Sequence, residues 1–120
     1  MGRTVMIVDD PMFMRKILRG ILVENGYIIA AEAASGIEAM RHLHTSHPDV
    51  ILLDIILPDS IDLDLLESII TACPDSKVVV CSSIGEAHVI RKSLDLGARA
   101  YIHKPFTPET VTDVLGNLED

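Results

Sequence analysis

Three carboxylates and one lysine follow short apolar runs of the sequence. Asp9 and Asp10 come after the first run, Asp54 comes after the third, and Lys104-Pro105 comes after the fifth. Because like charges a few ångströms apart repel each other, clustered carboxylates need a compensating cation. Mg²⁺ suits one or two carboxylates with waters and a phosphate oxygen, whereas Ca²⁺ needs more protein ligands than these loops offer. Lys104 adds a mobile positive charge that can pair with a phosphoryl oxygen.

The elements that must position these residues are strands and helices in alternation. Apolar runs of strand length alternate with segments of helical periodicity, which is typical of βαβ units around a parallel sheet. The expected strands are Val5–Val8, Tyr27–Glu32, Val50–Leu53, Val78–Cys81 and Ala100–Ile102. Ligands bind at the carboxyl ends of the strands in such sheets, and right-handed crossovers bring distant loops together there. We therefore expect the carboxylates and the lysine to share one edge.

Turn and capping residues predict the helices between the strands. The first should begin with Asp10 as N-cap and Pro11 at its first position, and should end before Gly26. The next three are expected from Ser35-Gly36 to about His47, from about Leu63 to Ala72, and from about Glu86 to Leu96. The fifth should open with Thr107 as N-cap and Pro108 at its first position.

The first helix has an apolar face and a basic face at helical spacing. The expected buried residues are Phe13, Ile17, Leu18, Ile21 and Leu22, and the expected water-facing residues are Arg15, Lys16 and Arg19. Because aromatic residues are few, the core should be aliphatic.

Four segments carry a resemblance to a known family. VMIVDD, ILLDIILP, VVVCSS and AYIHKPF resemble the signature regions of response-regulator receiver domains, in the family's order and spacing. The resemblance covers the whole chain and is closest to the CheY group. It implies one domain over residues 1–120 with a doubly wound, five-stranded parallel sheet and five helices. The implied strand order is 2-1-3-4-5, the flavodoxin-like order for which CheY is itself a standard example.

The resemblance also implies the metal and phosphoryl sites. Asp54 would be the phosphoacceptor, Asp10 would ligate Mg²⁺ directly, and Asp9 would act largely through water. The backbone carbonyl of Ile56 would complete the protein ligands of the metal together with Asp54. Phosphoryl transfer depends on positioning and charge stabilisation, and attack by a carboxylate gives an acyl phosphate that can serve as a signal.

Three further residues match the family's switch. Ser82 and Lys104 would each bind a phosphoryl oxygen, and Tyr101 occupies the aromatic switch position. Lys104-Pro105 would be a cis peptide, an arrangement essentially confined to X-Pro bonds.

The resemblance implies protein partners as well. A sensor histidine kinase would donate the phosphoryl group, and the face of the fourth helix, fifth strand and fifth helix would bind an unknown downstream protein. The domain would be a monomer or a phosphorylation-dependent dimer.

The sequence departs from the family pattern at three positions. Asp62 stands where a turn glycine is expected, and aspartate tolerates positive φ better than most residues. Two positions that tune dephosphorylation in the family are Ile56 and Ile84 here. Because apolar side chains cannot orient an attacking water, we predict slow autodephosphorylation.

Two other functions share parts of this pattern. An aspartyl-phosphate phosphatase or phosphotransferase also uses aspartate, Mg²⁺ and lysine, but it has a second aspartate where this chain has Ile56. A flavin-binding protein of flavodoxin type needs a Gly/Ser/Thr-rich phosphate loop after the first strand, where this chain has Asp9-Asp10-Pro11. A receiver that no longer takes phosphate is also open, although every phosphorylation position is filled. We expect a signalling switch and not an enzyme, with no organic cofactor.

Composition narrows the partners and the compartment. The net charge of −8 disfavours direct nucleic-acid binding, which depends on basic residues. The first residues have neither a secretory signal nor a membrane span, so we expect a cytoplasmic protein without membrane insertion. Cys73 and Cys81 lack metal-site spacing and should be ordinary thiols. The chain ends shortly after the fifth helix, as a stand-alone regulator or a fragment of a longer one.

Overall fold

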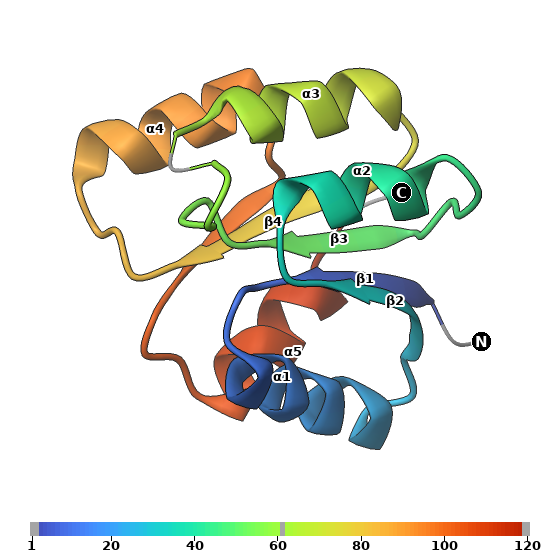
Figure 1. Cartoon of the computed structure of the whole chain (residues 1–120). Helices are drawn as coiled ribbons and strands as arrows, with labels where there is room; N and C mark the ends of the chain where they lie inside the picture. Colours follow the sequence, from blue (N-terminus) through green and yellow to red (C-terminus); the bar gives the residue numbers. More distant parts are fainter. Residues whose placement is uncertain (1–2, 61, 119–120) are drawn as a thin grey trace.

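The computed structural model describes residues 3–60 and 62–118, and these form a parallel sheet with helices on both faces (Figure 1). The strands are β1 (Thr4–Val8), β2 (Ile28–Ala33), β3 (Val50–Leu53), β4 (Lys77–Ser82) and β5 (Ala100–His103). Their order in the sheet is β2-β1-β3-β4-β5, and every neighbouring pair is parallel. This confirms the predicted fold class.

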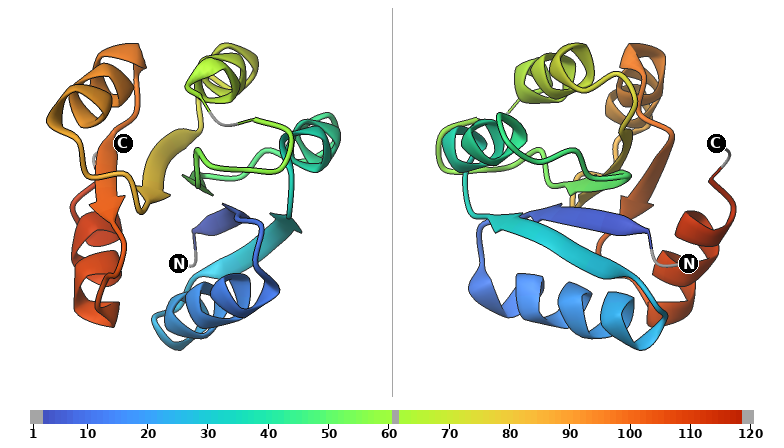
Figure 2. Two further views of the ribbon diagram at one scale, coloured as in Figure 1. Left: turned by 60° about the vertical axis from the view of Figure 1, so that its left-hand side comes forward. Right: turned by 90° about the vertical axis from the view of Figure 1, so that its right-hand side faces the viewer.

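Within residues 3–60 and 62–118, five helices cover the sheet in two layers. They are α1 (Met12–Glu24), α2 (Gly36–Leu43), α3 (Asp64–Ala72), α4 (Ala87–Leu96) and α5 (Pro108–Gly116). Helices α1 and α5 cover one face, and α2, α3 and α4 cover the other, as Figures 1 and 2 both show. Within the described part of the chain, no helix combines the length and apolarity needed to cross a bilayer.

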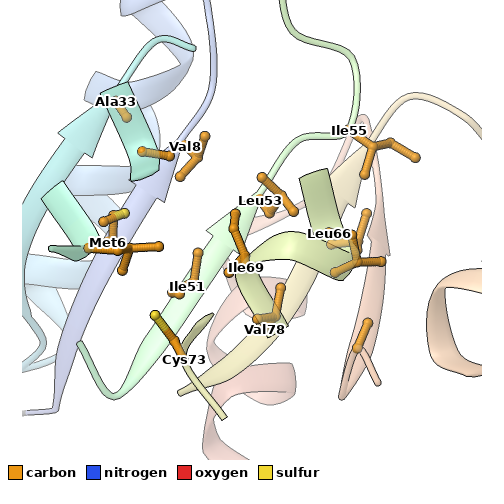
Figure 3. Close-up of a cluster of buried hydrophobic side chains, with 14 of the residues drawn as sticks. Met6, Val8, Ala33, Ile51, Leu53, Ile55, Leu66, Ile69, Cys73 and Val78 are labelled. Carbon is orange, nitrogen blue, oxygen red and sulfur yellow. The ribbon is translucent and has the colours of Figure 1, made fainter. Parts of the chain in front are cut away.

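The strands supply side chains to two aliphatic cores, one on each face. Met6, Val8, Ile51 and Leu53 belong to the cluster beneath α2 and α3, which also includes Leu66 of α3 (Figure 3). The alternate residues of β1 and β3 join Leu18, Leu22 and Leu115 in the other cluster. Successive side chains of a strand point to opposite faces of the sheet. A strand covered on both faces is therefore apolar throughout, as β3 is.

The helix boundaries differ from the sequence expectation at two places. The N-cap of α1 is Pro11, whose carbonyl accepts from the amides of Met14 and Arg15, and no side chain caps this end. Asp10 as N-cap was therefore wrong. Helix α2 ends at Leu43, not near His47, because single turns close after it and Pro48 disfavours helical backbone in the residue before it. Gly26 adopts φ +88° just beyond α1, which explains the glycine there.

The buried face of α1 lies further round the helix than expected. Leu18, Ile21 and Leu22 are buried, but Phe13 is 63% and Ile17 48% exposed. Their expected burial was wrong. A wide apolar stripe does not show which of its edges faces the sheet, and this helix turns Met14, not Phe13, into the core.

Candidate functional site

Backbone hydrogen bonds at the ends of the strands position the three charged residues. The amide of Asp9 donates to the carbonyl of Ala33 (3.0 Å), and the amide of Asp54 donates to that of Val8 (2.9 Å). The amide of Lys104 donates to the carbonyl of Ser82 at 2.9 Å. Each bond extends the hydrogen bonding of the sheet beyond a strand, so these residues lie at its carboxyl edge.

The side chains of these three residues meet in a partly buried group. Lys104 Nζ donates to Asp9 Oδ2 at 2.7 Å and to Asp54 Oδ2 at 2.9 Å. The other oxygen of Asp54, Oδ1, accepts from the amide of Ile56 at 2.9 Å. Asp9 is only 1% exposed and Asp54 only 7%. The structure therefore brings together Asp9, Asp54 and Lys104, as their positions after strands predicted.

Burial and charge act in opposite directions on this group. Burial raises the pKa of Asp9, and the bond and charge of Lys104 offset this effect only in part. Burial lowers the pKa of Lys104, but its bonds to Asp9 and Asp54 outweigh this, and its pKa lies above the ordinary value. The lysine is thus held in its charged form between the two carboxylates.

One carboxylate oxygen in this group has no hydrogen-bond partner in the part of the chain that the structure describes. Asp9 Oδ1 is buried and accepts no hydrogen bond from the described residues. Asp10 is exposed, and no three His, Cys, Asp or Glu side chains among residues 3–60 and 62–118 are close enough to hold a metal ion. An unpaired buried carboxylate oxygen beside a second carboxylate nevertheless fits a hard divalent cation. Oxygen donors at this edge are of the type that Mg²⁺ prefers.

Ser82 and Tyr101 both contact Ile84 in the loop between β4 and α4. The hydroxyl of Ser82, which is fully buried, accepts from the amide of Ile84 at 3.3 Å. The hydroxyl of Tyr101 donates to the carbonyl of Ile84 at 2.6 Å. Burial raises the pKa of Tyr101, so the phenol remains a donor at neutral pH. The two expected switch residues thus share one loop residue, and the Lys104-Pro105 bond beside them is cis.

Asp62 does not take the left-handed conformation of the turn glycine that it replaces. None of the described non-glycine residues has positive φ. Instead, Asp62 Oδ1 accepts from the amide of Asp64 at 3.0 Å, just before α3. Asp62 thus closes the turn through its own side chain, as aspartate can.

Two contacts near the site had no signal in the sequence. Arg15 Nη1 donates to the backbone carbonyls of Asp9 (2.8 Å) and Asp10 (2.7 Å). Asp59 accepts from the first amides of α2, those of Gly36 (2.8 Å) and Ile37 (2.9 Å). Arg15 was expected to face water, and its helical position alone gave no other indication.

Both cysteines are free thiols, as expected, and both are buried. Burial raises the pKa of Cys81 to about 12, and the nearby Lys104 offsets this only in part. A thiol with so high a pKa is not a nucleophile at neutral pH.

Known proteins resemble this chain over nearly its whole length. A model of the response regulator receiver domain matches residues 5–116. The chemotaxis protein CheY of Thermotoga maritima is 36% identical over 118 residues, which cover 98% of each chain. CheY of Listeria monocytogenes is 34% identical over 92% of this chain and 93% of its own.

Solved structures agree with this assignment. The CheX-CheY-BeF3-Mg+2 complex from Borrelia burgdorferi matches 94% of this chain and 86% of that chain, with a TM-score of 0.85 and 28% identity. A CheY-like receiver domain from Methanospirillum hungatei covers 97% of this chain and 92% of that chain, with a TM-score of 0.88 and 27% identity. The chain therefore belongs to the response regulator receiver domains, the CheY-like signalling modules of two-component systems.

Proposed function

We propose that Asp54 accepts a phosphoryl group in a Mg²⁺-dependent reaction. The observation that carries this proposal is the partly buried group in which Lys104 Nζ bridges Asp9 and Asp54. A carboxylate beside a fixed positive charge at the open edge of a parallel sheet can receive a phosphoryl group whose charge is then compensated. A sensor histidine kinase in the cytoplasm is the proposed donor.

In the transfer, a carboxylate oxygen of Asp54 attacks phosphorus in line with the leaving group. The new O–P bond forms as the P–N bond of the donor phosphohistidine breaks, and the leaving imidazole takes up a proton. Lys104 Nζ is already 2.9 Å from Asp54 Oδ2, so it can pair with a phosphoryl oxygen after a small movement. The hydroxyl of Ser82 would donate to another oxygen.

Residues of the same edge would hold the metal. We propose Asp9, Asp10, Asp54 and the backbone carbonyl of Ile56 as its protein ligands, with Asp9 acting largely through water. Bound Mg²⁺ would compensate the charge that develops on the phosphoryl oxygens. The unpaired Oδ1 of Asp9 supports this assignment, as does Mg²⁺ in the complex of the related Borrelia burgdorferi CheY.

The signal would leave through a protein-binding face of α4, β5 and α5. If the hydroxyl of Ser82 turns toward the phosphoryl group, it gives up its hydrogen bond from the amide of Ile84. The carbonyl of the same residue accepts from the hydroxyl of Tyr101. Phosphorylation would thereby shift the populations of the loop before α4 and of Tyr101. CheX in the Borrelia burgdorferi complex is a protein partner of that relative. We propose an unidentified protein partner here, and a monomer or phosphorylation-dependent dimer.

Loading with acetyl phosphate tests the proposed function. The wild-type protein should gain one phosphoryl group in intact-mass spectra when Mg²⁺ is present and none when it is chelated. Asp54→Asn should gain none in either condition, and Asp59→Asn should gain the group as the wild-type protein does. Equal uptake by Asp54→Asn, or uptake independent of divalent cations, would contradict the proposal.

A further inference from the structure

The guanidinium of Arg15 holds the backbone of the Asp9-Asp10 loop. Its Nη1 atom lies 2.8 Å from the carbonyl oxygen of Asp9 and 2.7 Å from that of Asp10. Arg15 stands in the first turn of α1, so this contact reaches back across the loop that precedes the helix. Its side chain is only 14% exposed. Hydrogen bonds from a charged donor are stronger than neutral ones and cost more to break.

Glu32 at the end of β2 orients the same guanidinium. Glu32 Oε1 lies 3.3 Å from Arg15 Nε, while its other oxygen accepts from Arg19 Nε at 2.6 Å. In the sheet Glu32 pairs with Ile7 of β1, two residues before Asp9. The glutamate therefore connects the end of the neighbouring strand to the arginine that holds the loop.

The backbone of Asp9 is thus held on both sides. Its amide donates to the carbonyl of Ala33 at 3.0 Å, and its carbonyl accepts from Arg15. The carbonyl of Asp9 lies in the peptide plane between the two aspartates, and that of Asp10 lies in the plane after it, so Arg15 orients both planes. These two planes flank the Cα of Asp10 and so determine the direction in which its side chain leaves the backbone, and the amide and carbonyl bonds of Asp9 do the same for Asp9.

From this geometry we infer that Arg15 is a positioning residue for divalent cation binding at Asp9 and Asp10, and that Glu32 acts through Arg15. The inference rests on the proposed function, because it takes these aspartates as metal ligands. Arg15 itself touches neither the metal nor the phosphoryl group. It lowers metal affinity by its charge and raises it by fixing the loop, and the second effect is the larger.

The sign of the change in affinity separates these two effects. The positive charge of Arg15 acts on Asp9 and opposes the approach of a cation. If charge were its only role, removing it would tighten cation binding. If Arg15 positions the loop, removing it weakens binding, because the ligands must then be ordered when the metal binds. Loss of groups that orient metal ligands typically weakens metal affinity by about 10–100-fold.

The test measures Mn²⁺ binding to the whole chain from the electron paramagnetic resonance signal of the free ion. We expect Arg15→Gln to weaken binding by about tenfold or more, and Glu32→Gln to weaken it less. Arg15→Lys should recover part of the loss, since an ammonium can still donate to the two carbonyls. Arg19→Gln is the matched control: it removes a positive charge paired with the same glutamate, from a side chain that is 49% exposed and lies on the next turn.

Each outcome decides the inference. Arg15→Gln that binds Mn²⁺ as well as or better than the wild-type protein overturns it, as does an equal weakening by Arg19→Gln. Urea unfolding verifies that each variant is folded. If Arg15→Gln does not fold, weaker Mn²⁺ binding by Glu32→Gln and Arg15→Lys than by the wild-type protein supports the inference, and unchanged binding by both overturns it. Failure of the wild-type protein to bind Mn²⁺ would instead refute the metal site of the proposed function and the inference with it.

Discussion

Lys104 Nζ lies 2.9 Å from Asp54 Oδ2, although their strands, β5 and β3, are separated by β4. The lysine side chain therefore crosses the end of β4 to reach the aspartate. The same nitrogen bonds Asp9 at 2.7 Å. The lysine thus holds together loops from three strands, and its pKa is raised by these bonds despite burial.

Replacing this lysine should destabilise the protein. Lys104→Met leaves two largely buried carboxylates without their cation, and breaking such a pair costs about 3–5 kcal/mol when it is fully buried. Because the lysine side chain is 14% exposed, we expect Lys104→Met to lower the free energy of unfolding by about 1–3 kcal/mol, measured with urea at pH 7. Lys92→Met, at an exposed position of α4, should cost under about 0.5 kcal/mol. Equal stabilities of the two variants would contradict this.

The cost of Lys104→Met should depend on pH. A lysine whose pKa is higher in the folded state stabilises the fold fully below the unfolded value of about 10.4. This contribution is lost as pH rises through the folded-state pKa. The stability difference between the wild-type protein and Lys104→Met should therefore narrow above about pH 10.4. A difference that grows in this range would show that the folded-state pKa is not raised.

Phosphate loss from Asp54 should be slow. Ile56 is 42% exposed, and its amide bonds Asp54 Oδ1, so an apolar side chain stands where a polar one could orient water. We expect Ile56→Asn to speed phosphate loss at least severalfold, measured by intact mass after removal of acetyl phosphate. Ile37→Asn, at an exposed position of α2, is the control. A wild-type lifetime of seconds would refute this prediction.

The loop between β4 and α4 should tolerate a side chain at position 85 only if His103 moves. A Cβ at Gly85 would lie 2.8 Å from His103 Nε2, and that nitrogen is 3.1 Å from the carbonyl of Ser83. Because His103 is exposed, its ring can rotate away, and Gly85→Ala should cost about 1 kcal/mol for the lost hydrogen bond.

A double-mutant cycle tests this contact. Once His103→Ala has removed the ring, Gly85→Ala should have little further effect on the urea midpoint. If the effects of Gly85→Ala and His103→Ala on stability simply add, the His103 ring is not what excludes a side chain at position 85.

Asp59 should stabilise the start of α2 in a pH-dependent manner. Hydrogen bonds from the amides of Gly36 and Ile37 lower the pKa of Asp59. An acid whose pKa is lower in the folded state stabilises it above the unfolded value, and this contribution is lost as pH falls through the folded value. Asp59→Asn should have a lower urea midpoint than the wild-type protein at pH 7, and the difference should shrink below about pH 4. Asp75→Asn, at an exposed position, should show no such difference. An Asp59→Asn midpoint unchanged at pH 7 would contradict the capping role.

Local patterns in the sequence determined the alternation of strands and helices along the chain, the aliphatic core, and the placement of Asp9, Asp54 and Lys104 after strands. These features follow from side-chain alternation, capping and the geometry of parallel sheets, which act over a few residues or recur in every such fold. The cap of Thr107 on α5 is one example, since its hydroxyl accepts from the amide of Thr110 as expected.

Only the tertiary structure decided which edge of α1 is buried, where Arg15 reaches and what Asp59 caps. Arg15 lies in the first turn of α1 and Glu32 lies near the end of the following strand β2, and Asp59 lies 22 residues from Ile37. Such contacts depend on how a helix is rotated against the sheet and how a loop is placed, and a single sequence does not encode either in local spacing. The unpaired oxygen of Asp9 likewise becomes visible only when all of its neighbours are in place.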